Sequence, residues 1–161
     1  MRITTVCLGN ICRSPMAEAV LRHELELAGV SGVIVESAGT SSWHMGDGAH
    51  PRTLATLRTH GLDLDHRSRQ ITTEWFDKDH PNRPDLVLAM DVDNLEMLHS
   101  IAPTETHESI RLIRSYDPAN AGLSIYLPAM SVPDPYYGDE SDYAAVFEML
   151  RVPCRVIVAG L

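Results

Sequence analysis

The fold is decided by one stretch near the start of the chain, Val6-Cys7-Leu8-Gly9-Asn10-Ile11-Cys12-Arg13-Ser14-Pro15. The apolar run before it, residues 3–6, predicts a strand that ends at Cys7. Ser14 and Pro15 are residue types that favour a helix N-cap and a first helical position, so we expect a helix to begin there. The stretch therefore predicts a strand, a tight loop and a helix in immediate succession.

The loop between this strand and this helix is suited to hold an anion. Gly9 and Asn10 tolerate the positive φ angles of a tight turn. Such a loop can direct its backbone N–H groups inward, and the helix start adds partial positive charge. We expect Cys7 at its floor to be largely thiolate, and Arg13, six positions later, to bind two phosphate oxygens. The predicted phosphate-binding loop consists of Leu8, Gly9, Asn10, Ile11, Cys12 and Ser14.

Other interpretations of the loop explain fewer of its residues. A lone cysteine at a strand end is usually a buried structural thiol, but here it coincides with the arginine, the glycine and the Ser-Pro pair. A Walker A loop would need Gly-Lys-Ser or Gly-Lys-Thr, which does not follow. A zinc site built on Cys7 and Cys12 would need two further ligands. We therefore expect phosphate-ester chemistry at Cys7, with no metal and no cofactor.

Composition indicates one globular domain over residues 1–161, long enough to bury a core. The formal net charge of −9 argues against a nucleic-acid or anionic-membrane binder. Three cysteines make no disulfide framework and favour a reducing compartment. No apolar run has the length of a membrane span, and the chain enters its first strand directly. We expect a cytoplasmic protein without membrane insertion.

Strands and helices alternate along the rest of the chain. This alternation predicts right-handed crossovers and an α/β fold, a doubly wound sheet of four parallel strands with helices on both faces. Ligands of such sheets bind at the carboxyl ends of the strands, where Cys7, Ser37 and Asp91 should gather. Pro153 is expected to kink or end the last helix. Further strands are predicted at 33–36, 85–90 and 109–113, and helices at 15–28, 54–60, 92–102 and 143–150.

A leaving group needs a proton, and Asp134 is the best candidate to donate it. Pro133 and Pro135 flank Asp134 and could fix its carboxyl at the end of a loop. The alternative is that Asp134 only begins a turn, as we expect of Asp117 before its proline. Asp134 is instead followed by two tyrosines, which suit an aromatic-walled cleft.

These motifs resemble the signature of the low-molecular-weight protein tyrosine phosphatases, and bacterial members most of all. The resemblance rests on residues 7–15, Glu36-Ser37-Ala38-Gly39, residues 66–70 and Asp134-Pro135-Tyr136-Tyr137-Gly138, in matching order over nearly the whole chain. It implies a central four-stranded parallel sheet. It also implies Cys7 as nucleophile, Arg13 as phosphate ligand and Asp134 as general acid.

The resemblance implies supporting roles as well. Asn10, Ser37 and His66 correspond to positions that hold the loop in shape, whereas Trp43, Tyr136 and Tyr137 correspond to the substrate cleft. For Cys12 the resemblance implies a reversible disulfide with Cys7, and a small buried residue is the alternative. No catalytic role is expected for His44, His50, His60, His80, His99 or His107.

The sequence thus predicts a protein-tyrosine-phosphatase that acts on phosphotyrosine-containing proteins through a phosphocysteine. A cognate tyrosine kinase is a candidate partner, and a monomer or weak dimer is expected. A protein arginine phosphatase is one alternative, but related members carry threonine where this chain has Ile11 and lack the tyrosine pair. A thiol-dependent arsenate reductase would need a resolving cysteine near residues 80–90, and none is there. A non-catalytic phosphotyrosine-binding module would lack the nucleophile, the arginine or the acid.

Overall fold

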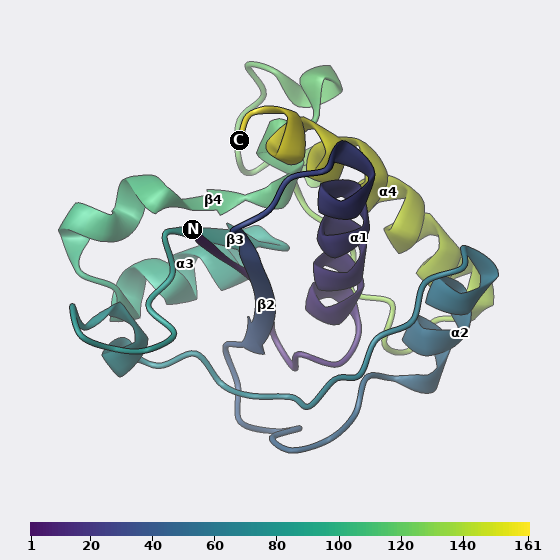
Figure 1. Cartoon of the computed structure of the whole chain (residues 1–161), viewed down its shortest axis with the longest axis horizontal. Helices are drawn as coiled ribbons and strands as arrows, with labels where there is room; N and C mark the ends of the chain where they lie inside the picture. The colour runs from purple at the N-terminus through teal and green to yellow at the C-terminus, as the bar shows by residue number, and fades with distance from the viewer.

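Four parallel strands form one sheet at the centre of the computed structural model, which describes residues 1–161 (Figure 1). Their order is β2-β1-β3-β4, so the chain moves to one side of β1 and then to the other. The carboxyl ends of β1 and β3 lie at this reversal, which is where ligands bind in such sheets. The strands are β1 (Arg2–Cys7), β2 (Ile34–Gly39), β3 (Leu86–Ala89) and β4 (Ile110–Leu112).

Helices cover both faces of the sheet, and successive strand residues point to opposite faces. Ile3 and Leu88 belong to the core cluster beneath α1 and α4, whereas Val6 and Val87 belong to the cluster beneath α3. The predicted α/β fold, with four parallel strands and helices on both faces, is confirmed. The helices are α1 (Arg13–Ala28), α2 (Pro51–Thr59), α3 (Val92–Ile101) and α4 (Glu140–Ala159).

Helix α1 begins two residues earlier than a Ser14 cap would require. Its N-cap is Cys12, which makes no side-chain capping bond, so Ser14 and Pro15 are the second and third helical residues. Proline is tolerated there because the first N–H groups of a helix have no partner within it. The prediction that Ser14 caps the helix is wrong. The Ser14 hydroxyl instead faces the loop and the end of β2, where it donates to the Ala38 carbonyl (3.3 Å).

Pro153 was expected to kink or end the last helix, and it does not end it, because α4 continues through Pro153 to Ala159. A proline has no N–H for the carbonyl four residues earlier, which here belongs to Met149. That carbonyl accepts a hydrogen bond from Arg114 Nη1 (2.9 Å). A side chain from outside the helix thus replaces the missing backbone donor.

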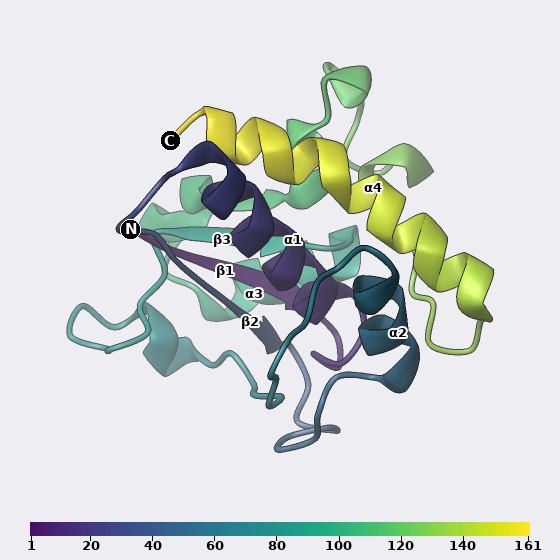
Figure 2. The ribbon, with the colours of Figure 1, turned by 45° about the vertical axis from the view of Figure 1, so that its right-hand side comes forward.

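Helix α2 and the first turns of α4 lie at the end of the sheet where α1 begins (Figure 2). The loop after β1 therefore lies among the starts of three helices. None of the helices combines the length and the apolar character that crossing a membrane would require.

Candidate active site

The loop between β1 and α1 wraps around the Cys7 sulfur. Asn10 has a φ of +55°, the one non-glycine residue with positive φ, and its backbone N–H lies 3.3 Å from Cys7 Sγ. Ser14 Oγ lies 3.1 Å from the same sulfur. Gly39, at the end of β2, makes room for this turn, because a Cβ there would lie 2.7 Å from the Leu8 carbonyl oxygen. The tight loop predicted from Gly9 and Asn10 thus depends on a third residue in another strand.

Arg13 is nearly fully buried, at 2% exposure, and three protein groups hold its guanidinium. Nη1 donates to the Asp91 carboxylate and to the Val132 carbonyl (3.1 Å), and Nη2 donates to Asp134 Oδ2 (3.3 Å). Nε is buried without a partner. Burial would lower the pKa of Arg13, but negative charge at Cys7 and at the two carboxylates raises it overall. The guanidinium therefore remains a cation, and its Nε–H is free to bind a ligand.

Asp91 was expected to gather with Cys7 and Ser37 at the carboxyl ends of the strands, but the sequence assigned it no role in the site. It does cap α3, because its Oδ1 accepts the Asn94 backbone N–H (2.8 Å). The same carboxylate reaches Arg13 because β3 lies beside β1 in the sheet. Its position directly after a buried strand predicted that it lies at this edge of the sheet, but not that it contacts Arg13.

Asp134 lies on a loop that is anchored to the sheet. The backbone N–H of Val132 donates to the Met90 carbonyl at the end of β3 (2.8 Å). Asp134 itself is half exposed, and its Oδ1 accepts the backbone N–H of Tyr136 (3.2 Å). The loop therefore brings a carboxyl group to the cavity that contains Cys7.

A cavity of about 240 Å³ opens above Cys7. His44 is a lining residue for which no role was predicted; a Cβ at Gly9 would lie 3.0 Å from its ring, and its Nδ1 lies 3.1 Å from Asp47 Oδ2. Tyr137 is almost fully exposed and Trp43 largely so, which places both at the rim. The lining residues are Cys7, Leu8, Gly9, Ile11, Cys12, Arg13, Trp43, His44, Asp134, Tyr136 and Tyr137.

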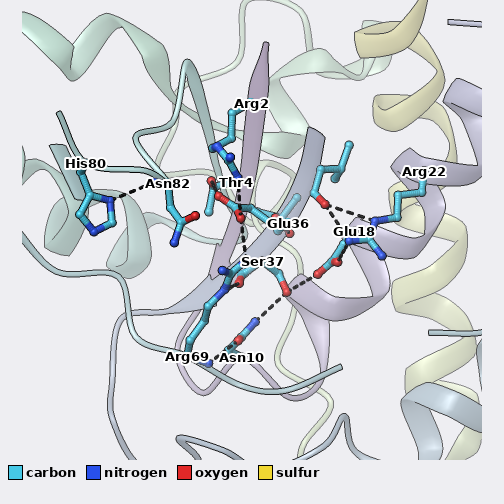
Figure 3. A network of polar contacts seen from close by, with 12 residues as sticks. Arg2, Thr4, Asn10, Glu18, Arg22, Glu36, Ser37, Arg69, His80 and Asn82 are labelled. Carbon is cyan, nitrogen blue, oxygen red and sulfur yellow. Dashed lines mark hydrogen bonds and ion pairs between the residues drawn. The ribbon is translucent and has the colours of Figure 1, made fainter. Parts of the chain in front are cut away.

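Asn10 is the centre of a polar network behind the loop (Figure 3). Its Nδ2 donates to Ser14 Oγ (3.0 Å) and to Ser37 Oγ (2.9 Å). Ser37 in turn donates to Glu18 Oε2 (2.6 Å), and the Arg69 backbone N–H donates to Asn10 Oδ1 (3.0 Å). The structure thus brings Asn10 and Ser37 together, and adds Glu18 from α1 and Arg69 from a distant segment.

The Asn10 carbonyl is held from the other side. His66 Nε2 lies 2.7 Å from this oxygen, and Ser68 Oγ donates to it, also at 2.7 Å. Burial lowers the pKa of His66 below its ordinary value. A neutral His66 that donates from Nε2 fits this contact, because the carbonyl only accepts.

Arg69 joins this network to the outer strand. Its Nε donates to the Ser37 carbonyl (3.1 Å), and its Nη2 pairs with Glu36 (2.8 Å), which also pairs with Arg2 (2.9 Å; Figure 3). The residues that shape the loop are therefore fixed by groups on β1 and β2.

Cys12 is buried and faces α4 rather than being bonded to Cys7. All three cysteines are free thiols, and Cys12 Sγ lies 3.4 Å from the Tyr143 hydroxyl. Burial raises the pKa of Cys12 to about 11, so it is a neutral thiol at neutral pH. A disulfide with Cys7 remains a prediction.

Comparison with known proteins places the whole chain in one class. The family model described as low molecular weight phosphotyrosine protein phosphatase matches residues 2–161. The low molecular weight protein-tyrosine-phosphatase of Streptomyces coelicolor is 46% identical over 162 residues, which cover 99% of this chain and 93% of that protein.

Solved structures agree with this class. The crystal structure of a protein tyrosine phosphatase from Entamoeba histolytica with Hepes in the active site is 31% identical, with a TM-score of 0.87, and covers 99% of this chain and 95% of that one. The YwlE arginine phosphatase, from Bacillus subtilis, is 28% identical, with a TM-score of 0.81, and the match covers 100% of this chain and 95% of that one.

The fold and the matches define a phosphatase. The chain belongs to the low molecular weight phosphotyrosine protein phosphatase family, and it is an enzyme of the protein-tyrosine-phosphatase type.

Proposed function

We propose that this chain hydrolyses phosphotyrosine in proteins through a phosphocysteine on Cys7, with Asp134 as the general acid and without a metal ion. One observation carries the proposal: Cys7, Arg13 and Asp134 line the same cavity. A protein tyrosine kinase would then supply the substrate.

The substrate phosphate binds over the loop. The backbone N–H groups of the loop and the first turn of α1 attract its negative charge. Arg13 offers its unpartnered Nε to one phosphate oxygen. A second oxygen takes the Nη2 donor that Asp134 holds in the free site, which completes a bidentate contact. Asp91 keeps Nη1 and so preserves the orientation of the guanidinium.

The Cys7 thiolate attacks phosphorus, and the bond between phosphorus and the phenolic oxygen breaks. Asp134 gives its proton to the departing oxygen. In the second step Asp134 takes a proton from a water molecule, whose oxygen attacks the phosphocysteine and releases inorganic phosphate and the thiolate. As the thiolate leaves, the Ser14 hydroxyl, 3.1 Å from Cys7 Sγ, turns its proton from the Ala38 carbonyl to the sulfur and stabilises it. Each step conserves charge and protons without a metal ion.

The walls of the cavity favour an aryl ester. Tyr136 and Trp43 offer aromatic surface to the phenyl ring of phosphotyrosine. The thiol lies beneath them at 3% exposure, so a short alkyl phosphate has less wall to contact on its way to Cys7.

Two variants test the roles of the nucleophile and the acid. Cys7→Ser should abolish turnover of an aryl phosphate, and undiminished turnover would refute the proposal. Asp134→Asn should lower kcat by about 10²–10⁴-fold, because that is the usual contribution of a general acid. The loss should be larger for poor leaving groups, and competitive inhibition by phosphate should persist.

A competition among phosphotyrosine, phosphoserine and phosphoarginine peptides tests the substrate class. We expect phosphotyrosine to give the highest kcat/KM. A preference for phosphoarginine would overturn the substrate assignment and leave the phosphocysteine chemistry intact, as the structural likeness to YwlE allows.

A further inference from the structure

His50 connects the phosphate loop, helix α2, helix α4 and the tyrosine wall of the cavity. Its backbone N–H donates to the Ile11 carbonyl in the loop (2.7 Å). Its side chain caps α2, because Nδ1 accepts the Arg52 backbone N–H (3.1 Å). His50 itself does not line the cavity.

The His50 ring contacts two tyrosines. It stacks on Tyr143 of α4, with the ring centroids 5.2 Å apart and the planes at 28°. It also meets the ring of Tyr136 nearly edge-on, at 5.9 Å and 72°. Tyr143 is fully buried and its hydroxyl contacts Cys12, so it provides a fixed support. Tyr136 is more than one-third exposed and forms part of the cavity wall, so it is the partner that can move.

We propose that neutral His50 is a positioning residue that holds Tyr136 against the aryl group of the substrate, and that protonation of His50 releases this wall. The inference rests on the proposed function, because it assigns Tyr136 to the aryl part of the substrate. It further predicts that the site binds an aryl-bearing ligand more tightly than inorganic phosphate, and that this preference depends on pH.

The cap makes the contact sensitive to protonation. Nδ1 can accept the Arg52 N–H only while it carries no proton, so a protonated ring must turn away from the start of α2. A cation at a helix N-terminus is also unfavourable. The turn would remove the ring from its contacts with Tyr143 and Tyr136.

The groups around His50 oppose its positive charge. Burial lowers the pKa of His50, and the nearby Arg52 and His44 lower it further. Tyr143, which faces the ring from α4, remains a neutral phenol because burial raises its pKa. Asp47 pairs with His44 rather than with His50. The pKa of His50 therefore lies below its ordinary value of 6.5, and the neutral ring predominates at pH 7.5.

The test uses two competitive inhibitors, inorganic phosphate and benzylphosphonate. Both are expected to occupy the phosphate-binding loop, but only benzylphosphonate has a ring that can contact Tyr136 in the cavity wall. The ratio of the two inhibition constants therefore measures how much the aryl ring contributes to binding. We expect this ratio to favour benzylphosphonate most at pH 7.5 and to decline as the pH falls to 5.

Two histidine variants separate positioning from stability. His50→Asn keeps a good N-cap at every pH and removes the ring. It should lower the aryl preference at pH 7.5 by about threefold to tenfold, the usual range for one aromatic contact, and flatten its pH dependence. His44, whose ring also lies near Tyr136 (centroids 6.1 Å apart), is unchanged in both proteins. The matched control is His60→Asn: His60 caps the other end of α2 and stacks on Phe147 (3.8 Å), and it does not line the cavity.

The outcomes are distinct. The inference fails if the wild-type ratio is constant between pH 7.5 and 5, if His50→Asn keeps the wild-type ratio, or if His60→Asn lowers it equally. The proposed function itself fails if neither phosphate nor benzylphosphonate competes with an aryl phosphate substrate.

Discussion

Asn10→Ala should cost more stability than its small change in volume suggests. The Asn10 side chain makes two buried hydrogen bonds, to Ser14 and to Ser37, and accepts a partly buried one from the Arg69 backbone. At about 0.5–1.5 kcal/mol for each, their loss costs about 1.5–4.5 kcal/mol. Alanine at a φ of +55° adds about 1 kcal/mol of strain. We therefore expect the free energy of unfolding to fall by about 2.5–5.5 kcal/mol.

Urea unfolding followed by tryptophan fluorescence measures this loss, and Asn10→Gly is the matched variant. It loses the same three hydrogen bonds but tolerates positive φ, so it should be about 1 kcal/mol more stable than Asn10→Ala. Both variants should also lose kcat/KM, because Ser14 and the Cys7 sulfur lose their shared support. A loss below about 1 kcal/mol in Asn10→Ala would refute the view that this side chain holds the loop.

Three further predictions follow from particular contacts. Trp43→Ala should raise KM for a phosphotyrosine peptide several-fold and leave the inhibition constant of phosphate unchanged; because Trp43 is 74% exposed, the free energy of unfolding should change by less than about 0.5 kcal/mol. Weaker phosphate binding would contradict the position of Trp43 at the rim of the cavity. Arg114→Met should lower the free energy of unfolding by about 1.5–3 kcal/mol, and by less in a Pro153→Ala background, where the new backbone N–H can donate to the Met149 carbonyl. Equal losses in both backgrounds would exclude the explanation that Arg114 replaces the donor missing at Pro153. The free energy of unfolding should fall as the pH drops below 6.5, because burial lowers the pKa of His66 and the unfolded chain then binds more protons than the folded one. Urea midpoints measured from pH 8 to 5 should depend less steeply on pH in His66→Asn, and an unchanged dependence would show that other groups cause it.

The sequence was most informative where structure depends on neighbours in the chain. The strand, loop and helix around Cys7 follow from residues within one stretch, and the alternation of strands and helices was enough for the sheet. Boundaries were less secure. Proline fits any early helical position, so Ser14 and Pro15 could not mark the first residue of α1. The effect of Pro153 depends on Arg114, which lies 39 positions earlier and belongs to no motif.

The residues that hold Arg13 and the loop in place depend on contacts between segments that are distant in the sequence and meet only in the folded sheet. Asp91 reaches Arg13 because β3 pairs with β1, and Glu18 reaches Ser37 because α1 packs on β2. Each residue is an ordinary acidic residue in its local sequence. His50 could not be identified from its local sequence either, because a histidine before Pro51 predicts neither a helix cap nor a ring in contact with two tyrosines.

The central proposal is that phosphate passes through Cys7. Rapid quenching of the enzyme during turnover of an aryl phosphate, followed by mass spectrometry of the peptide that contains Cys7, measures this directly. We predict a phosphoryl group on the Cys7 sulfur that disappears as substrate is exhausted and that is absent from Cys7→Ser. Full turnover with no adduct on Cys7, together with an active Cys7→Ser variant, would contradict it.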